Sequence, residues 1–330
     1  MRLSLIPFLL MIAPLSAQEP TPRRPVNTYS IVAVDSATGE IGVAVQSHWF
    51  SVGSVVTWAE PGVGAVATQS FVQPSYGPRG LYLMRTGTSA PDALAALLRA
   101  DPDSQVRQVA MIDSHGRVAA HTGSRDIQAA GHVVGVRYSV QANLMRSDAV
   151  WPAMAAAFES ATGDLATRML AALDAAEAAG GDIRGRQSAA LIVVSGDIGE
   201  SPWNRVFDLR VEDHPDPLGE LRRLLRVARA YKAATEGDDF VAAGQIDRAL
   251  ERYREASAIL PDSATNGELI YWVAVTLADL GRVDEAIPLF ARSFAQDPSW
   301  RELTTRLPAA GLLRADEATI ERILREARGR

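Results

Sequence analysis

The chain has 330 residues, a formal net charge of -6, 47% hydrophobic residues and no cysteine. This length allows two packed cores, and the acidic balance does not favour a nucleic-acid-binding protein, which needs a basic face to displace counterions. The absence of cysteine excludes disulfides, thiolate metal sites and cysteine nucleophiles, and lysine chemistry is excluded before Lys232, the only lysine in the sequence.

The first 17 residues have the pattern of a secretory signal peptide. Arg2 is followed by an apolar run from Leu3 to Leu15, and the small residues Ser16 and Ala17 precede a polar stretch. The run is shorter than the roughly 20 residues that a membrane-spanning helix needs. We therefore expect cleavage after Ala17, no stable membrane insertion and a secreted or periplasmic location. A buried or membrane-anchoring helix is the alternative.

Residues 18–27 carry three prolines and no apolar periodicity, which predicts an extended linker in front of a folded domain at 28–216. TYSIVAVD (28–35) and IGVAVQSH (41–48) are rich in apolar and β-branched residues and flank the turn sequence SATGE, so they predict a β-hairpin. GVGAVATQS (62–70) predicts a further strand.

Pairs of helices and groups of strands then alternate. The predicted elements are helices at 76–87 and 89–101, a hairpin at 105–123, a strand pair at 132–145, helices at 148–160 and 164–179, and strands at 186–196 and 204–213. Ser89 is the expected N-cap of the second helix. This order predicts an α+β fold, a four-layer αββα sandwich of two stacked antiparallel sheets with a helical layer on each outer face.

From residue 217 onward the sequence predicts helices only, and one segment is repeated. GQIDRALERYREASAILP (244–261) overlays GRVDEAIPLFARSFAQDP (281–298) at an offset of 281 - 244 = 37 residues. The repeat resembles the tetratricopeptide family, whose small, aromatic and terminating residues are matched by Ala274, Gly281, Ala286, Phe290 and Pro298. The resemblance implies an all-α tetratricopeptide-like domain at 217–330, in which each helix pair covers the apolar face of its neighbour.

Two uses of this helical domain remain open. Either residues 217–330 bind a protein partner, or they form a short appendage that docks on the first domain or mediates assembly, for example into a homo-oligomer. Only about two repeats are visible, which is few for a binding groove.

No cofactor and no metal site is predicted. GVGAVA (62–67) has the letters of a dinucleotide-binding motif, but Pro61 precedes it and a β-rich run follows where a helix should begin. His115 and His121 lie six positions apart with a turn between them, which is poor spacing for metal ligands.

Polar side chains gather at the ends of several predicted strands, where they would need hydrogen-bond partners. Ser47 ends the second strand, and Gln141 and Asn143 stand in an otherwise apolar one. The stretch GDIRGRQS places four more in front of a buried strand, at Arg184, Arg186, Gln187 and Ser188. Each alone is compatible with a satisfied structural network, and together they indicate the rim of one pocket.

Three stretches resemble one bacterial family: TYSIVAVDSATGEIGVAVQSHWFSVGSVVTWAEPGVGAVATQSFVQPSYGPRGL, AGHVVGVRYSVQANLM and GGDIRGRQSAALIVV. They are similar to the domain-of-unknown-function 1028 family, which is placed in the N-terminal nucleophile (Ntn) hydrolase superfamily. The resemblance runs from Thr28 to about Val211 and implies the same αββα sandwich. It implies less about activity, because the family is largely uncharacterised and a fold does not determine a function.

In Ntn hydrolases the nucleophile is the first residue of the mature domain, and its own α-amine is the base that activates the hydroxyl. Chains of this family commonly begin at or near T-F-S, which is matched by Thr28, Tyr29 and Ser30. The resemblance therefore implies that Thr28 is the nucleophile. An α-amine has a pKa of about 7.7 to 8.0, so part of it is already the free base at neutral pH.

A second cleavage is needed before that amine exists. Removal of a signal peptide after Ala17 leaves 27 - 17 = 10 residues ahead of Thr28, whose nitrogen is then still an amide. Cleavage between Asn27 and Thr28 would free it, although many autoprocessing relatives have glycine where this sequence has Asn27. The sequence leaves open whether this cleavage occurs.

The remaining candidate residues are assigned oxyanion-binding and substrate-binding roles in the same pocket. Asn143, or Ser47 with its backbone, would donate to the oxyanion that develops during amide cleavage. Arg79 and Arg186 would hold a substrate carboxylate, or would pair with structural carboxylates instead. The remaining residues assigned to substrate binding are Gln141 and Ser188.

The preferred interpretation is an exported Ntn-type amidohydrolase that cleaves a small amide or peptide-like bond through an acyl-enzyme on Thr28, without a cofactor. The alternative is a non-catalytic protein that binds a ligand in the same pocket and recruits a partner through its helical repeats. The segment ahead of Thr28 favours the second interpretation, and the polar residues at several strand ends favour the first.

Overall fold

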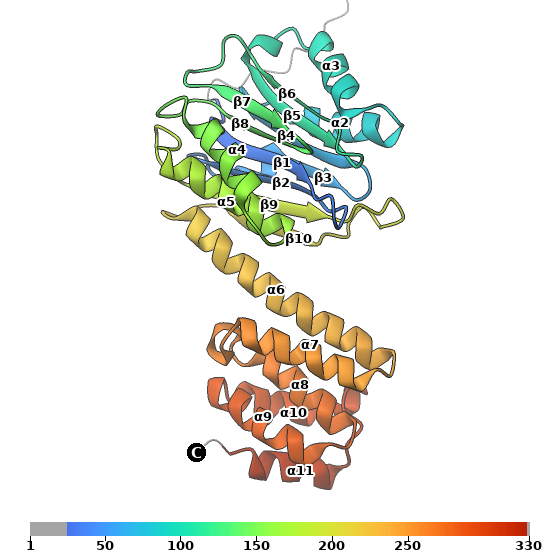
Figure 1. Ribbon diagram of the computed structural model, residues 1–330. Helices are drawn as coiled ribbons and strands as arrows, with labels where there is room; N and C mark the ends of the chain where they lie inside the picture. The colour runs from blue at the N-terminus through green and yellow to red at the C-terminus, as the bar shows by residue number, and fades with distance from the viewer. Residues whose placement is uncertain (1–24, 329–330) are drawn as a thin grey trace, which may run out of the picture.

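The computed structural model describes residues 25–328, a mixed α+β region followed by a region of helices (Figure 1). The predicted signal peptide, its cleavage after Ala17 and residues 18–24 of the predicted linker lie outside the described residues. Among residues 25–328, no helix is both long enough and apolar enough to cross a membrane.

Two antiparallel sheets form the α+β region. The six-stranded sheet has the order β10-β9-β2-β1-β8-β7, with β1 (Thr28–Val34), β2 (Ile41–Ser47), β7 (Gly131–Gly135), β8 (Tyr138–Ala142), β9 (Ser188–Val194) and β10 (Phe207–Val211). The four-stranded sheet has the order β3-β4-β5-β6, with β3 (Thr57–Glu60), β4 (Gly64–Ser70), β5 (Arg107–Asp113) and β6 (Val118–Thr122). The hairpins predicted at 28–48 and 105–123 are confirmed.

A pair of helices covers the outer face of each sheet. On the four-stranded sheet lie α2 (Tyr76–Arg85) and α3 (Ala90–Ala100), and on the six-stranded sheet lie α4 (Val150–Ser160) and α5 (Leu165–Ala178) (Figure 1). Two short elements lie in connections, namely α1 (Gly53–Val56) and the 3-10 helix η1 (Ser104–Val106). The predicted N-cap is confirmed, because the Ser89 hydroxyl accepts a hydrogen bond from the Asp92 N–H at 3.2 Å.

The space between the two sheets changes character along the strands. Side chains alternate between the two faces of a strand, so every second residue of the central strands points into this space. At one end these residues are apolar and form one buried cluster, the apolar half, which includes Val32, Ile41 and Ile112. At the other end, the polar half, they are equally buried and are Thr28, Ser30, Ser47, Gln69, Gln108, Gln141 and Ser188.

The helical region contains the predicted repeat. Its elements are α6 (Pro217–Ala242), α7 (Ile246–Ile259), η2 (Asp262–Thr265), α8 (Glu268–Asp279), α9 (Val283–Gln296), α10 (Ser299–Arg306), η3 (Pro308–Ala310) and α11 (Glu317–Glu326). Gly244 and Gly281 stand at the same point of the two repeated segments and have φ angles of 71° and 76°, a left-handed conformation that favours glycine. Each precedes the second helix of a packed pair, α6 with α7 and α8 with α9, so the repeat is confirmed.

Helix α6 belongs to both regions (Figure 1). Leu218, Leu221 and Leu225, near its start, are buried in the core of the α+β region, whereas Ala230 packs with Leu260 of the helical region. The boundary between the two hydrophobic cores therefore lies within α6 and not between residues 216 and 217, where the sequence placed it. A change in composition marks where the helix begins, and it does not mark where the helix changes its packing partner.

Candidate active site

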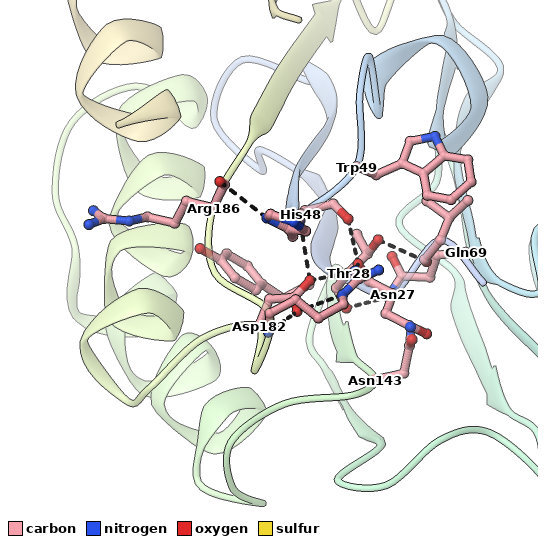
Figure 2. A network of polar contacts seen from close by, with 12 residues as sticks. Asn27, Thr28, His48, Trp49, Gln69, Asn143, Asp182 and Arg186 are labelled. Atoms are coloured by element: carbon pink, nitrogen blue, oxygen red, sulfur yellow. Dashed lines mark hydrogen bonds and ion pairs between the residues drawn. The ribbon is translucent and has the colours of Figure 1, made fainter. Parts of the chain in front are cut away.

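Thr28 begins β1, one of the two central strands of the six-stranded sheet, and is fully buried in the polar half. Its hydroxyl donates to the carbonyl oxygen of Val26 at 2.9 Å. Its carbonyl oxygen accepts from the Asn143 N–H at 3.1 Å and from Gln69 Nε2 at 3.2 Å. Thr28 is therefore held from one side by the segment that precedes it and from the other by the neighbouring strands (Figure 2).

The two residues before Thr28 are part of the fold. Asn27 is 1% exposed and Val26 is fully buried, with its side chain in the apolar cluster between the sheets. Val26 pairs with Ser70 through two hydrogen bonds, at 2.6 Å from Val26 N to Ser70 O and 2.9 Å from Ser70 N to Val26 O. The extended linker predicted for 18–27 does not reach these two residues, because a single valine after a proline-rich stretch carries no periodicity that would reveal its burial.

The carbonyl oxygen of Asn27, in the peptide bond to Thr28, accepts two hydrogen bonds. One comes from the hydroxyl of Ser47, which lies directly opposite Thr28 on β2. The other comes from Arg184 Nη2 at 2.8 Å. Donors on a carbonyl oxygen, above all charged ones, draw electron density away from its carbon. The carbonyl carbon of Asn27 is therefore polarised toward attack by a nucleophile.

Asp182 orients Arg184. Its carboxylate accepts from Arg184 Nε at 3.0 Å and from Nη2 at 2.6 Å, and it also accepts from the His48 N–H at 3.2 Å (Figure 2). The Asp182 side chain is fully buried, and that of Arg184 is 26% exposed. A two-point pair of this kind sets the plane of the guanidinium, so Nη2 is aimed at the Asn27 oxygen.

A chain of amides determines how Asn143 is turned. Gln108 Nε2 donates to the carbonyl oxygens of Gly131 at 3.2 Å and Ala142 at 2.9 Å, so Gln108 Oε1 faces the other way. That oxygen accepts from Gln69 Nε2 at 2.7 Å and from Asn143 Nδ2 at 2.9 Å. Asn143 Oδ1 is buried without a hydrogen-bond partner. One N–H of the Asn143 amide, predicted to donate to an oxyanion, therefore donates to Gln108, and Asn143 also offers a free acceptor.

Gln141 and Ser188 also lie in the polar half, in contact with other groups. Gln141 Nε2 donates to the Ser30 hydroxyl at 2.6 Å, which in turn donates to Gln69 Oε1 at 2.6 Å. The Ser188 hydroxyl accepts from the Val52 N–H at 3.1 Å and donates to a main-chain carbonyl of the loop after β2. Gln141 therefore supports the network beside Thr28, and Ser188 holds a loop.

The structure does not bring the two predicted arginines to Thr28. The Arg186 guanidinium forms ion pairs with Glu177 at 3.4 Å and Asp216 at 3.6 Å, and it points away from Thr28 in Figure 2. Arg79 is exposed on α2 and lines a separate hollow of about 120 Å³ that contains none of the hydrogen-bond partners of Thr28. For Arg186, the structure shows the pairing with carboxylates that the sequence had left open.

Four residues that shape the site received no role from the sequence. The sequence places Arg184 in the polar run before β9 and assigns no role to Asp182, Gln69 or Gln108. The two glutamines carried the same signal as Gln141, a polar residue in an apolar strand. The pairing of Asp182 with Arg184 depends on a turn, and turns cannot be predicted from a periodic pattern.

Burial raises the pKa of two acids beside the site. The pKa of the Tyr29 phenol lies well above its usual value, mainly through burial and also through the Glu177 carboxylate, which accepts its hydroxyl at 2.8 Å. Burial also raises the pKa of Asp126, against the opposing effect of hydrogen bonds from the Ser70 hydroxyl at 2.7 Å and the Gly123 N–H at 2.9 Å. The Tyr29 phenol is therefore neutral at physiological pH, and Asp126 supports the residue that pairs with Val26.

The histidines considered as metal ligands lie on and beside the β5–β6 hairpin. His121 Nε2 lies 2.8 Å from the carbonyl oxygen of Ser104. In the described part of the chain, no group of three or more His, Cys, Asp or Glu side chains is arranged to hold a metal ion.

Comparison with known proteins gives matches for both regions. Residues 28–221 match the "Family of unknown function (DUF1028)", and residues 240–307 match the tetratricopeptide repeat. The crystal structure of protein SPO2555 from Silicibacter pomeroyi, which is described as a DUF1028 protein, is similar at 32% sequence identity and a TM-score of 0.55. The similarity covers 61% of this chain and 89% of that one. No curated protein matches the chain.

Proposed function

The chain belongs to DUF1028, a family of unknown function, and we propose that its α+β region is an Ntn-type hydrolase that cleaves a small amide or peptide-like bond with Thr28 as nucleophile. Two stacked sheets with a helix pair on each outer face support the assignment to the four-layer αββα sandwich. A fold does not determine a function, so the proposal depends on the bond that precedes Thr28.

One observation carries the proposal, namely the two donors on the Asn27 carbonyl oxygen. In amide cleavage this oxygen takes on negative charge, and a donor already in position is typically worth about 3 to 4 kcal/mol in the transition state. A serine hydroxyl and an arginine held by the buried Asp182 carboxylate both reach this one oxygen. They act on the bond that must break to free the Thr28 amine.

The first reaction is cleavage of the chain by itself. The Thr28 hydroxyl oxygen attacks the Asn27 carbonyl carbon, and Ser47 and Arg184 stabilise the charge on the carbonyl oxygen. The bond from that carbon to the Thr28 nitrogen breaks, and the hydroxyl proton passes to the nitrogen. The product is an ester between Asn27 and Thr28. Water hydrolyses this ester, which leaves a carboxylate on Asn27 and restores the Thr28 hydroxyl beside a free α-amine.

The mature enzyme would then use the freed amine as its base. In an extended strand the N–H and C=O of one residue point to the same edge, and the Thr28 carbonyl bonds to the Asn143 N–H, so the Thr28 nitrogen also faces Asn143. Asn143 Oδ1, buried and without a partner, is available to hold this amine. The amine takes the Thr28 hydroxyl proton as the hydroxyl attacks a substrate carbonyl, and it returns the proton to the leaving amine.

The remaining sequence predictions are consistent with this role. We propose that the protein is exported, as its N-terminal sequence indicates, and that the substrate is met outside the cytoplasm. Tetratricopeptide repeats suggest protein-protein interaction, so the helical region is proposed to hold a protein partner, either another protein or a second copy of the chain in a homo-oligomer.

The N-terminus of the purified protein tests the proposal. Intact-mass measurement and N-terminal sequencing of protein from its native compartment should show a chain that begins at Thr28. A chain that begins at Gln18 would exclude the free-amine mechanism and would favour the non-catalytic, ligand-binding or scaffolding function. The Thr28→Ala protein, expressed in the same way, is the control for cleavage by host proteases.

A further inference from the structure

Val26 fills a gap at the edge of the four-stranded sheet. β3 pairs with β4 only from Gly64 to Ala67, so residues 68–70 have β5 on one side and no strand of the described chain on the other. Val26 occupies this free edge and forms both main-chain hydrogen bonds with Ser70. Addition of an extended segment to a sheet edge is a recurrent mode of peptide binding, in which main-chain bonds give affinity and side-chain pockets give selectivity.

Ser70 is held in place for this pairing by contacts that do not involve Val26. Its φ angle is 68°, in the left-handed region that residues other than glycine seldom adopt. Its hydroxyl donates to Asp126 at 2.7 Å, and Asp126 is itself held by the Gly123 N–H at 2.9 Å. Backbone strain of this kind persists where the surroundings enforce it, and it is concentrated at functional sites.

Release of the segment before Thr28 would uncover a binding site for an extended peptide segment. The side chain of Val26 is fully buried in the cluster that also contains Val45, Val52 and Val72. Once the bond after Asn27 is cut, its departure leaves a small apolar space and two unpaired main-chain groups on Ser70. Buried main-chain groups require partners, so this site favours another extended segment.

The chemistry of the two reactions connects this site to the substrate. Self-cleavage passes through an ester between the Asn27 carbonyl carbon and the Thr28 oxygen. A substrate that carries the same acyl group gives the same ester, and only the amine that leaves is different. The contacts that hold Val26 and Asn27 in the uncut chain are therefore contacts to the acyl group in the mature enzyme.

We infer that the mature site takes an extended peptide whose second residue before the cleaved bond is small and aliphatic, with the main chain of that residue paired to Ser70. This inference rests on the proposed function and names its substrate class. Asn27 Oδ1 is buried without a partner, which is unfavourable for an amide side chain at the position next to the bond. Alanine at that position is therefore bound at least as well as asparagine.

Binding of four product-like peptides tests the inference without relying on turnover. The protein is the chain that begins at Thr28, obtained by self-cleavage or by release from a fusion tag whose protease leaves Thr28 first. The reference ligand is acetyl-Pro-Val-Asn with a free carboxylate, titrated by calorimetry. Glycine in place of valine should weaken binding about tenfold through the lost apolar contact, and N-methylvaline about tenfold through the lost bond to the Ser70 carbonyl. Alanine in place of asparagine should bind equally well or more tightly.

Equal binding of all four peptides, or binding of none, overturns the inference. Hydrolysis is measured separately on the acetyl-Pro-Val-Ala and acetyl-Pro-Gly-Ala anilides. Selective binding without hydrolysis would reject the proposed hydrolase while the peptide site stands, and hydrolysis without preference for valine would reject the site alone.

A second measurement on the full chain covers the case in which residues 28–330 do not fold by themselves. Hydrogen–deuterium exchange at the Ser70 amide should be about tenfold faster in Val26→Gly than in the unchanged protein, because the bond that protects this amide is weakened. Val26→Ile, which keeps the aliphatic side chain, is the matched control and should leave the exchange rate within about threefold. Equal exchange in both variants would overturn the inference.

Discussion

The apolar and polar halves of the inter-sheet space are equally buried, yet they are held together differently. In the apolar half, residues such as Val32 and Ile112 need only contact with their neighbours. In the polar half every group needs a hydrogen bond, and a chain of bonds from Gln141 to Gln108 supplies them. A partly satisfied polar network is worse for stability than an apolar core, so apolar side chains would hold the two sheets together at least as well. We interpret the polar half as the support of the site at Thr28.

Two buried oxygen atoms near Thr28 are exceptions, because they lack the hydrogen bond that a buried polar group needs. Asn27 Oδ1, just before Thr28 in the chain, and Asn143 Oδ1, just after β8, are buried acceptors without donors. Such groups are unfavourable, and in native proteins they call for an explanation such as a catalytic role or a ligand. Substitutions in the two halves should therefore separate chemistry from stability.

Thr28→Ala should have the largest effect of these substitutions, on the rate of cleavage and hardly on stability. Loss of the nucleophile should slow cleavage after Asn27 by at least about 10⁴-fold, because the hydroxyl that attacks the Asn27 carbonyl carbon is removed. The free energy of unfolding should change by only about 1 kcal/mol, because one hydrogen bond, to the Val26 carbonyl, is lost. Time-resolved mass spectrometry and urea unfolding measure the two quantities. Thr28→Ser keeps a hydroxyl and should still cleave; unimpaired cleavage in Thr28→Ala would exclude Thr28 as nucleophile.

Ser47→Ala should slow the same cleavage by about 10²- to 10³-fold, because one of the two donors on the Asn27 oxygen is removed. The rate is followed by mass spectrometry after dilution from denaturant. Ser188→Ala is the matched control, since Ser188 lies directly opposite Ser47 on β9 and bonds to a loop instead. Equal slowing in both variants would mean that Ser47 acts only through the stability of the sheet.

Ile41→Ala should give the opposite pattern in the apolar half. Ile41 is fully buried, and its truncation leaves a cavity, so unfolding should become easier by about 2 to 5 kcal/mol. The cleavage rate of the folded fraction should stay unchanged, because none of the donors around Thr28 is touched. Urea unfolding gives the first quantity and mass spectrometry the second. A large loss of cleavage in well-folded Ile41→Ala protein would show that the two halves are not separable.

Asp126→Asn should have the smallest effect, visible as a change in pH dependence. Burial raises the pKa of Asp126 above its unfolded value of about 3.9, so the folded protein holds the proton more tightly. The stability that this group contributes is complete below that unfolded value and is lost as the pH rises through the folded pKa. The stability of the unchanged protein relative to Asp126→Asn should therefore fall over the range from about pH 4 upward. Urea unfolding across this range measures it, and a constant difference would contradict the prediction.

Much of the fold could be predicted because its signals are local. The alternation in β1 and β2, the cap at Ser89 and the repeat at Gly244 and Gly281 each depend on residues within one or two elements. Ser47, Gln141 and Asn143 form a predicted group because each is polar in or at the end of an apolar strand, whereas Thr28 is indicated by the family resemblance. Their individual bonds were not predicted, since these depend on the order of strands in each sheet and on how the two sheets face each other.

The sequence by itself determined the elements, the repeat and the family resemblance, because periodicity, capping and motifs are properties of neighbouring residues. Only the tertiary structure decided that Val26 completes a sheet edge, that α6 is shared between two cores, and that Arg184, rather than Arg79 or Arg186, reaches the bond before Thr28. Arg184 and Asn27 are 157 positions apart in the chain. Contact between residues so distant depends on the path of the whole chain, so it cannot be inferred from spacing along the sequence.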